Sequence, residues 1–400
     1  MSAIGAYLLG HPLVSVAIAL AFGDLIGRFQ FGKFRLGPTV GTLLVAMIIG
    51  GITGPFSIDG NVSMTGFALC VFVIGYEAGP SLVNSLKRTG AKVLGLTATF
   101  IVMGTGMTLL LAKVFGLDKG TTAGIFAGSL TQTAVIATAG DAIQALGLDE
   151  AATTALQNNV SIAYALTYFF GMAGVMLLIE KFEPWLLKVD LKQEVAKTAE
   201  KIGYVEEKAS ASTGGTAPVR ETSDIWFIYI GITIGLIIGA ITIHAAGMPL
   251  SVGSGVAILI VGMVMGNYAE KHPGKGYIAP GARWFLKIWG LNLFVACVGL
   301  GAGSNFVNAF KTMGIKILLI GVFVAAGTHL ITMFVGRYLL KMDVVDVLGT
   351  QCGASTIIAA LNVLVEDTGS SIFALAYAPA YAIGNIVLTM IGPLIIYFMS

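Results

Sequence analysis

Residues 66–92 read GFALCVFVIGYEAGPSLVNSLKRTGAK, and residues 290–316 read GLNLFVACVGLGAGSNFVNAFKTMGIK. The two stretches align without a gap over their full length. A chance match between apolar segments would pair Ala, Leu and Val, but it would rarely keep glycines, an asparagine and lysines in phase. The matched residues are Gly66, Gly75, Gly79, Asn84 and Lys87, which pair with Gly290, Gly299, Gly303, Asn308 and Lys311. We infer that one unit has been duplicated, and that each copy holds an apolar helix interrupted by glycines.

Shorter matches extend the duplication along the chain. The pattern Ala-Tyr-Ala-x-x-Tyr-x-x-Gly ends at Gly171 in the first half and at Gly384 in the second. Likewise, MIIG at residues 47–50 corresponds to MVMG at residues 263–266. The offset differs from one match to the next, so the loops have changed length while the segments have been kept.

The composition defines the class of protein. Hydrophobic residues make up 56% of the chain, charged residues 11%, and the mean hydropathy is +0.88. Soluble domains carry about 25% charged residues, so this chain cannot cover a water-facing surface, and we expect a polytopic membrane protein embedded in the lipid bilayer. The net charge of +2 provides no basic face for phosphates and excludes nucleic acid as a partner.

Loop charges predict the topology. Six apolar segments precede the polar interval Glu180–Asp224 and six follow it, and Lys and Arg cluster after the first, third and sixth segments. These loops are expected to be cytoplasmic. The signs agree if the segment Thr122–Ala145 enters and leaves on one face or is a broken helix. Each half then crosses the membrane five times, so the halves are inverted and both termini lie outside the cytoplasm.

The predicted fold class is therefore an all-α polytopic membrane protein. It has two inverted five-span repeats with broken helices or re-entrant segments, arranged as a transport (core) domain and a scaffold domain. The predicted divisions are residues 1–182 for the first repeat, 183–223 for a cytoplasmic linker and 224–400 for the second repeat. Within the linker, Glu183–Lys208 has the mixed charges of a surface helix, and the Ser/Thr/Gly/Pro-rich remainder is typical of a flexible connection.

Helices interrupted by glycine in inverted repeats indicate where a secondary transporter binds its substrate. Unwound backbone exposes N–H and C=O groups, and a bilayer tolerates it only where it lines a cavity. The first pair of candidate breaks is Gly75–Ser81 and Gly299–Ser304, and it supplies these candidate substrate contacts: Gly75, Tyr76, Glu77, Gly79, Gly299, Gly301, Gly303 and Ser304. The alternative is close helix packing through small residues. Glu77 is a candidate partner for a cation or a substrate ammonium, or else a loop acid near the cytoplasmic face.

The second pair of candidate breaks is GSLTQT at residues 128–133 and CGAST at residues 352–356. Each precedes an Ala-rich apolar helix, and the alignment pairs Gln132 and Thr133 with Ser355 and Thr356. Hydroxyl and amide groups at the start of a helix can cap its N-terminus or hold a substrate carboxylate. The candidate contacts are Ser129, Thr131, Gln132, Thr133, Gly353, Ser355 and Thr356.

No pattern in the sequence predicts catalysis. Cys70, Cys297 and Cys352 lie in apolar surroundings without CxxC spacing, and the four histidines are too scattered for a metal site. A Ser/His/Asp set, HExxH, GxSxG and a P-loop are all absent from the sequence. We therefore expect a protein that is not an enzyme and has neither cofactor nor metal.

The Gly-rich segment of each half, followed by SLTQTAVIATA at residues 129–139 or GASTIIAAL at residues 353–361, resembles the aspartate:alanine exchanger family of bacterial transporters. The resemblance covers nearly all the hydrophobic chain. It implies exchange of small carboxylates or amino acids across the bacterial inner membrane. It also implies a large cytoplasmic domain between the halves, and this chain departs there, because only residues 180–224 fill the gap.

These observations predict an antiporter of the aspartate:alanine type with an elevator-like alternating-access mechanism. The segments that contain the breaks are expected to move as one body against a scaffold, which includes Thr39–Ile52 and Val252–Gly266 and forms a homodimer contact. The main alternative is a sodium- or proton-coupled organic anion symporter, similar to the bile-acid-type carriers. A channel and a non-transporting sensor or scaffold protein are further alternatives.

Overall fold

The computed structural model describes residues 3–31, 34–35, 37–54, 56, 58–88, 90–202, 222–245, 248–251, 254–272, 274–309, 311 and 314–399. The fold is built from helices, as the composition predicted, and six of those described are long and apolar enough to cross a membrane. Two antiparallel hairpins were not predicted. They are β1 (Gln30–Phe31) with β2 (Phe34–Arg35), and β3 (Thr242–Ala245) with β4 (Met248–Ser251).

The helices of the first half follow one another with short connections. They are α1 (Ala3–Gly10), α2 (Pro12–Gly27), α3 (Pro38–Thr53), α4 (Gly60–Arg88), α5 (Ala91–Phe115), α6 (Lys119–Ser129), α7 (Ala134–Ala145) and α8 (Glu150–Phe169). A continuous helical run extends α8 through η1 (Phe170–Gly174), α9 (Val175–Leu177), η2 (Leu178–Phe182) and α10 (Glu183–Leu187). The predicted boundary after residue 182 therefore falls inside this run.

The described part of the interval between the halves contains the amphipathic helix α11 (Leu191–Ile202), within the predicted surface helix. Lys201 of α11 forms a 2.7 Å ion pair with Asp343, and this hydrogen bond raises the pKa of the Lys201 amine. Residues 203–221, which include the predicted flexible connection, lie outside the described residues.

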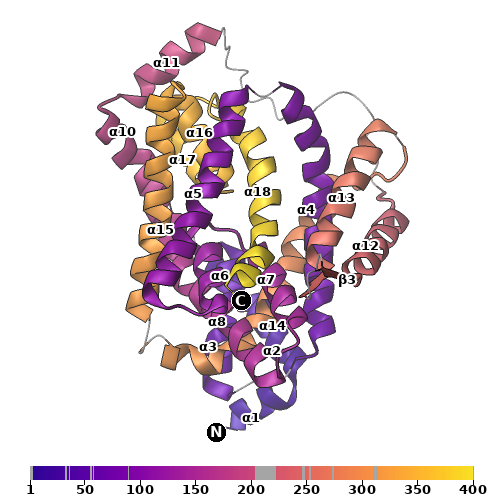
Figure 1. Cartoon of the computed structure of the whole chain (residues 1–400). Helices are drawn as coiled ribbons and strands as arrows, with labels where there is room; N and C mark the ends of the chain where they lie inside the picture. Colours follow the sequence, from indigo (N-terminus) through magenta and orange to yellow (C-terminus); the bar gives the residue numbers. More distant parts are fainter. Residues whose placement is uncertain are drawn as a thin grey trace.

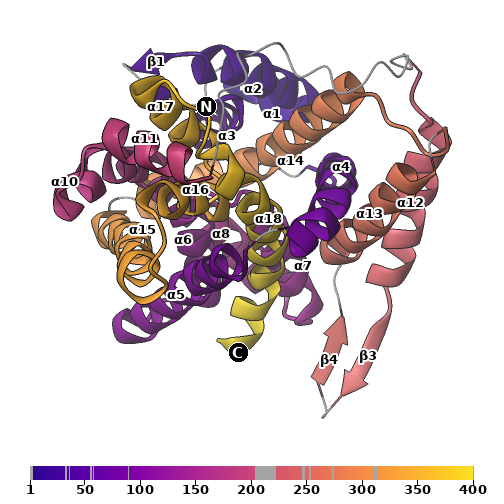
Figure 2. The ribbon, with the colours of Figure 1, turned by 90° about the horizontal axis from the view of Figure 1, so that it is seen from above.

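The second half repeats the order of the first. Its helices are α12 (Ile225–Gly239), α13 (Ser254–Lys271), α14 (Pro280–Ala309), α15 (Ile315–Phe334) with η4 (Val335–Leu339), α16 (Val344–Ala354), α17 (Ile358–Thr368) and α18 (Ala374–Phe398). Figure 1 shows α4, α13 and α12 on one side and α5, α15 and α16 on the other, with α18 between them. The view from above in Figure 2 has the same arrangement.

The first pair of predicted breaks was wrong. Helix α4 runs unbroken through Gly75, Gly79 and Pro80, and α14 runs unbroken through Gly299 and Gly303. The physical reason is packing: a Cβ atom at Gly79 would overlap the carbonyl oxygen of Met263 on α13. These glycines let helix backbones touch, which is the alternative interpretation of the same sequence pattern.

The two halves contact each other through matching positions. As Gly79 of α4 packs on Met263 of α13, so Gly303 of α14 packs on the carbonyl group of Met47 of α3. Gly66 and Gly290, which are equivalent in the duplicated stretch, each lie against the carbonyl oxygen of the other. The α3–α14 pair therefore reproduces the α13–α4 pair.

The second pair of predicted breaks is present. Residues 130–133 separate α6 from α7, and residues 355–357 separate α16 from α17. Helix α6 packs closely on α8 through Gly124 and Gly128, and α16 packs on α18 through Gly349 and Gly353, in each case against backbone of the partner helix. Each half thus presents one broken helix held by the helix that follows it in the chain.

Candidate functional site

The two helix breaks meet each other inside the protein. The hydroxyl of Thr131 donates a 2.6 Å hydrogen bond to the carbonyl oxygen of Ser355. Thr131 has a φ of 55° and Thr356 a φ of 59°. A β-branched residue with positive φ is strained. Strained residues persist where the surrounding structure fixes their conformation, and they cluster at functional sites.

The backbone of the breaks corrects the alignment of their residues. The amides of Thr131 and Thr356 bond to the carbonyl oxygens of Gly128 and Gly353, at 3.1 and 2.8 Å. Thr131 is therefore the counterpart of Thr356, and the predicted pairing of Thr133 with Thr356 was out of register. The sequence alone allowed the wrong offset because residues 128–133 offer two threonines, Thr131 and Thr133, as the counterpart of Thr356.

Gln132 binds to α18 of the second half. Its buried amide nitrogen donates to the carbonyl oxygen of Asn385 at 2.8 Å, to the side-chain oxygen of Asn385 at 3.0 Å and to the hydroxyl of Thr389 at 3.0 Å. These bonds fix the first break against the second half. Asn385 and Thr389 were not predicted, although Asn385 is a polar residue in an apolar segment, directly after the repeated Gly384.

The other hydroxyls at the breaks have distinct partners. Thr133 shares a 2.7 Å hydrogen bond with the hydroxyl of Tyr164, and the Ser355 hydroxyl donates to the carbonyl oxygen of Gln351 at 2.7 Å. The buried hydroxyl of Ser129 has no hydrogen-bond partner among the described residues. A Cβ atom at Gly321 of α15 would lie 3.2 Å from it, so Ser129 faces α15.

The predicted N-capping role was wrong. Thr133 and Ile357 hold the N-cap positions of α7 and α17, and neither side chain caps the helix. The Thr133 hydroxyl instead bonds to the Tyr164 hydroxyl, so that two buried polar groups satisfy each other. Two helix N-termini without side-chain caps therefore start at the meeting breaks, and their partial positive charge favours an anion.

Glu77 lies on α4 and forms a 2.6 Å ion pair with Lys287 of α14. The cation expected at Glu77 is thus supplied by the chain itself. Tyr76 points elsewhere: its hydroxyl donates to the carbonyl oxygen of Gly276 at 2.9 Å, beside Arg283. Among the residues predicted around the first pair of breaks, Glu77 has a charged side chain that is partly exposed. Ser304 is partly buried.

Gly301 differs from Gly299 and Gly303 of the same helix, because no backbone of another helix packs closely against it. A Cβ atom added there would have one neighbour within 4 Å, the side-chain oxygen of Asn158 at 3.9 Å. Gly301 thus faces α8, the helix that holds the first break, whereas Gly299 packs on Ala46 and Leu43 of α3. Asn158 was not predicted, but the polar run Gln157-Asn158-Asn159 before an apolar segment was a signal that could have found it.

Fold and site together define a polytopic membrane permease with two broken helices that meet at its centre. The sequence profile described as the predicted permease membrane region of the aspartate–alanine exchanger type matches residues 15–183 and 227–397. The chain belongs to this family of transporters. The suspected family and the prediction that the protein is not an enzyme are both confirmed.

Individual relatives agree with this assignment. The chain is 30% identical to the aspartate/alanine antiporter of Tetragenococcus halophilus, over 100% of both proteins. It is 24% identical to an uncharacterized transporter of Zymomonas mobilis over 97% of this chain and 98% of that protein. The alignment with the antiporter has 545 positions against 400 residues here, so at least 145 positions (545 − 400) hold residues of that protein only.

Proposed function

We propose that this protein is a secondary antiporter that exchanges small carboxylates or amino acids, of the aspartate:alanine type. The observation that carries the proposal is the meeting of two strained helix breaks, joined by the bond from Thr131 to Ser355. Broken helices at the interface of two repeats are where secondary transporters bind substrate. The family and the name of the Tetragenococcus relative support the same substrate class.

The two halves act as inverted repeats of five spans each, with both termini outside the cytoplasm of a bacterial inner membrane. Three features support this arrangement. The α3–α14 contact has the same form as the α13–α4 contact, Gly66 and Gly290 touch each other, and Figure 1 shows α16–α17 near the top of the molecule with α6–α7 below them. Figure 1 also places the N-terminus at the end opposite α11.

Substrate carboxylates bind at the breaks, at the N-termini of α7 and α17, which follow Thr131 and Thr356 in the chain. The positive ends of the two helix dipoles suit an anion. The Asn158 amide and the Glu77–Lys287 pair lie on the neighbouring helices and interact with the amino group or the second carboxylate. Gly75, Gly79, Gly299 and Gly303 take no part, since their faces are covered by α13 and α3.

Transport follows an elevator-like motion. The body that carries α6–α8 and α16–α18 moves against a scaffold of α3, α4, α13 and α14, and the scaffold forms the contact in a homodimer. The close backbone packing of the scaffold helices supports their role as a rigid unit.

Counterflow into proteoliposomes tests the function. The purified chain, in vesicles loaded with unlabelled alanine, is expected to take up labelled aspartate without a sodium gradient and to fail in empty vesicles. Uptake that needs sodium and no internal alanine would identify a symporter instead. Continuous current without saturation would identify a channel.

The site is tested by Thr131→Val and Thr356→Val in the same assay. Each removes a hydroxyl and keeps the β-branched shape. We expect exchange to fall about tenfold or more, as for loss of a hydrogen bond to a charged group. Thr99→Val is the matched control, because the Thr99 hydroxyl donates to the Gly95 carbonyl oxygen of its own helix, away from both breaks. Normal exchange by both break variants would remove the assignment.

A further inference from the structure

A buried polar cluster lies where α10, α15 and α16 come together, one helical turn before the second break. It consists of Glu183, His329 and Gln351, each with no exposed surface. The Gln351 side-chain nitrogen joins them. It donates to the Glu183 carboxyl oxygen Oε1 at 3.3 Å and to the backbone carbonyl oxygen of His329 at 2.6 Å.

Three polar atoms of this cluster lack a partner among the described residues. They are Glu183 Oε2, Gln351 Oε1 and His329 Nε2. The His329 ring is within 2.8 Å of the Ala325 carbonyl oxygen through Nδ1. A carbonyl oxygen only accepts, so Nδ1 carries the hydrogen and Nε2 of the neutral ring is an acceptor. All three unpartnered atoms are therefore acceptors, and the cluster is short of donors.

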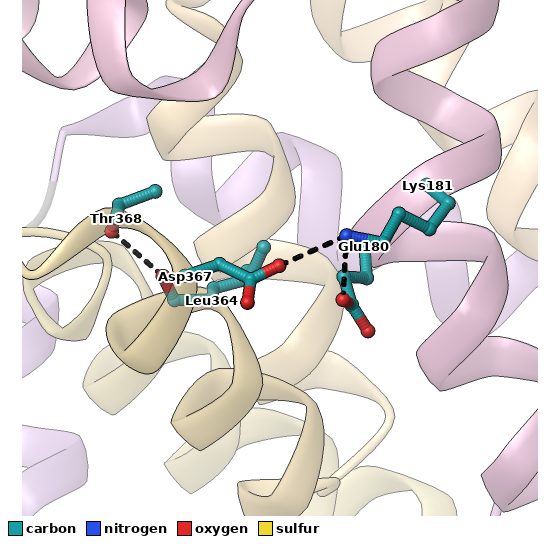
Figure 3. Close-up of polar contacts among 5 residues, drawn as sticks. All are labelled: Glu180, Lys181, Leu364, Asp367 and Thr368. Carbon is teal, nitrogen blue, oxygen red and sulfur yellow. Dashed lines mark hydrogen bonds and ion pairs between the residues drawn. The ribbon is translucent and has the colours of Figure 1, made fainter. Parts of the chain in front are cut away.

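Among the described residues, none of the groups recorded around Glu183 is a compensating cation. Cys352 on α16 lies near enough to interact electrostatically with the Glu183 carboxylate, and full burial disfavours the charged form of the His329 ring on α15. On η2, Glu180 and Lys181 are close in sequence, but they pair with each other at 2.8 Å, and Lys181 also reaches Asp367 at 3.2 Å (Figure 3). A buried carboxylate without a counter-charge takes up a proton instead of remaining ionised.

We propose that Glu183, Gln351 and His329 form a buried proton-binding site, in which the carboxyl group of Glu183 carries the proton. Protonation adds one O–H bond to Oε2, with the proton supplied by water. It removes the buried charge and turns one surplus acceptor into the donor that the cluster lacks. The Gln351 amide holds Oε1 as the carbonyl oxygen of the protonated acid.

The site goes beyond the proposed exchange, and its existence does not depend on it. It lies where the helical run of the first half contacts α16 of the second, the helix that leads into a break. Proton uptake at Glu183 would therefore sense the position of α16, and this use in transport rests on the proposed function. Proton binding itself is measured without any substrate.

Infrared difference spectroscopy on the full chain in lipid tests the proposal. Spectra between neutral and alkaline pH are expected to contain the C=O band of a protonated carboxyl group that shifts in D2O. Glu183→Gln removes this band. The matched control, Glu180→Gln, is expected to keep the band, because Glu180 pairs with Lys181 at 2.8 Å and is not part of the cluster. An unchanged band in Glu183→Gln would overturn the proposal.

A second variant decides the matter if Glu183→Gln does not fold. Gln351→Met removes the donor to Oε1 and keeps the volume, so the band should persist and move to higher wavenumber. A band that stays in place would contradict the geometry. If sodium chloride, and not choline chloride, shifted carboxylate bands that depend on Glu183, the site would bind a metal cation and the proton would be excluded. Failure of counterflow with a positive infrared result would affect the exchange proposal alone.

Discussion

The glycine-rich helices α4 and α14 and the hydroxyl-rich breaks after α6 and α16 are two regions that the same sequence reasoning treated alike. The structure separates them. In α4 the glycines face the backbone of α13, and the helix continues. At the breaks the strained positions are threonines, Thr131 and Thr356, and the glycines nearby pack on α8 and α18. Glycine in an apolar helix therefore marks close approach of helices more reliably than it marks a break.

The largest expected effect tests the packing side of this comparison. Gly79→Ala places a methyl group against the Met263 carbonyl group, and we expect a loss of roughly 1–3 kcal/mol in stability from overpacking. Gly106→Ala on α5 is the control, because a Cβ atom there meets nothing within 4 Å, and it should gain about 1 kcal/mol from helix propensity. Thermal unfolding in detergent measures both. Equal stability of the two variants would contradict the described contact.

A second prediction concerns the link between a break and the scaffold. Asp141 of α7 accepts hydrogen bonds from the hydroxyl of Ser254 and the amide of Gly255, both at 3.1 Å, and so caps α13. Asp141→Ala should cost about 1 kcal/mol, as for loss of an N-cap, and should also change the rate of exchange. Asp149→Ala, which removes the cap of α8 at Ala152, should cost a similar amount and leave the rate unchanged. Equal rates in both variants would argue against motion of α7 relative to α13.

A third prediction tests whether the backbone of the second helix break is strained. Thr356→Gly relieves a positive φ of 59° and should raise stability by about 1 kcal/mol. Thr332→Gly, at a helical position of α15 with the hydroxyl bonded to Thr328, should lower it by a similar amount. Thermal unfolding distinguishes the signs. A loss of stability in Thr356→Gly would mean that the Thr356 side chain makes contacts that outweigh its strain.

The smallest expected effect is that of the Glu77–Lys287 pair. The two side chains are 34% and 27% exposed, so their interaction resembles a surface ion pair of up to about 1 kcal/mol. A double-mutant cycle with Glu77→Gln and Lys287→Met measures it, and the coupling should shrink as salt is added. A coupling well above this value that ignores salt would show that the pair is shielded from water.

Much of the architecture was readable from the sequence. The duplication at Gly66 and Gly290 followed from residues that align without a gap, the membrane class from composition, and the break within residues 122–145 from the loop charges. What failed was the interpretation of individual polar residues. N-capping was one of two roles considered for Thr133, whose hydroxyl instead binds Tyr164, and an external cation was one of the partners considered for Glu77, which instead pairs with Lys287. Their partners lie 31 and 210 positions away, beyond the reach of local patterns.

The sequence by itself determined that this is a membrane protein, that its two halves are copies of one unit, and that it belongs to its transporter family. The membrane class follows from the total apolar content, and the duplication and the family follow from many residues that match at a constant spacing. Each of these signals adds contributions from the whole chain, so none depends on a single contact. Only the tertiary structure decided which glycines pack and which segments break. The reason is that glycine is compatible both with a continuous helix and with a helix break. Which of the two forms depends on whether another backbone packs against the glycine, as that of Met263 does at Gly79.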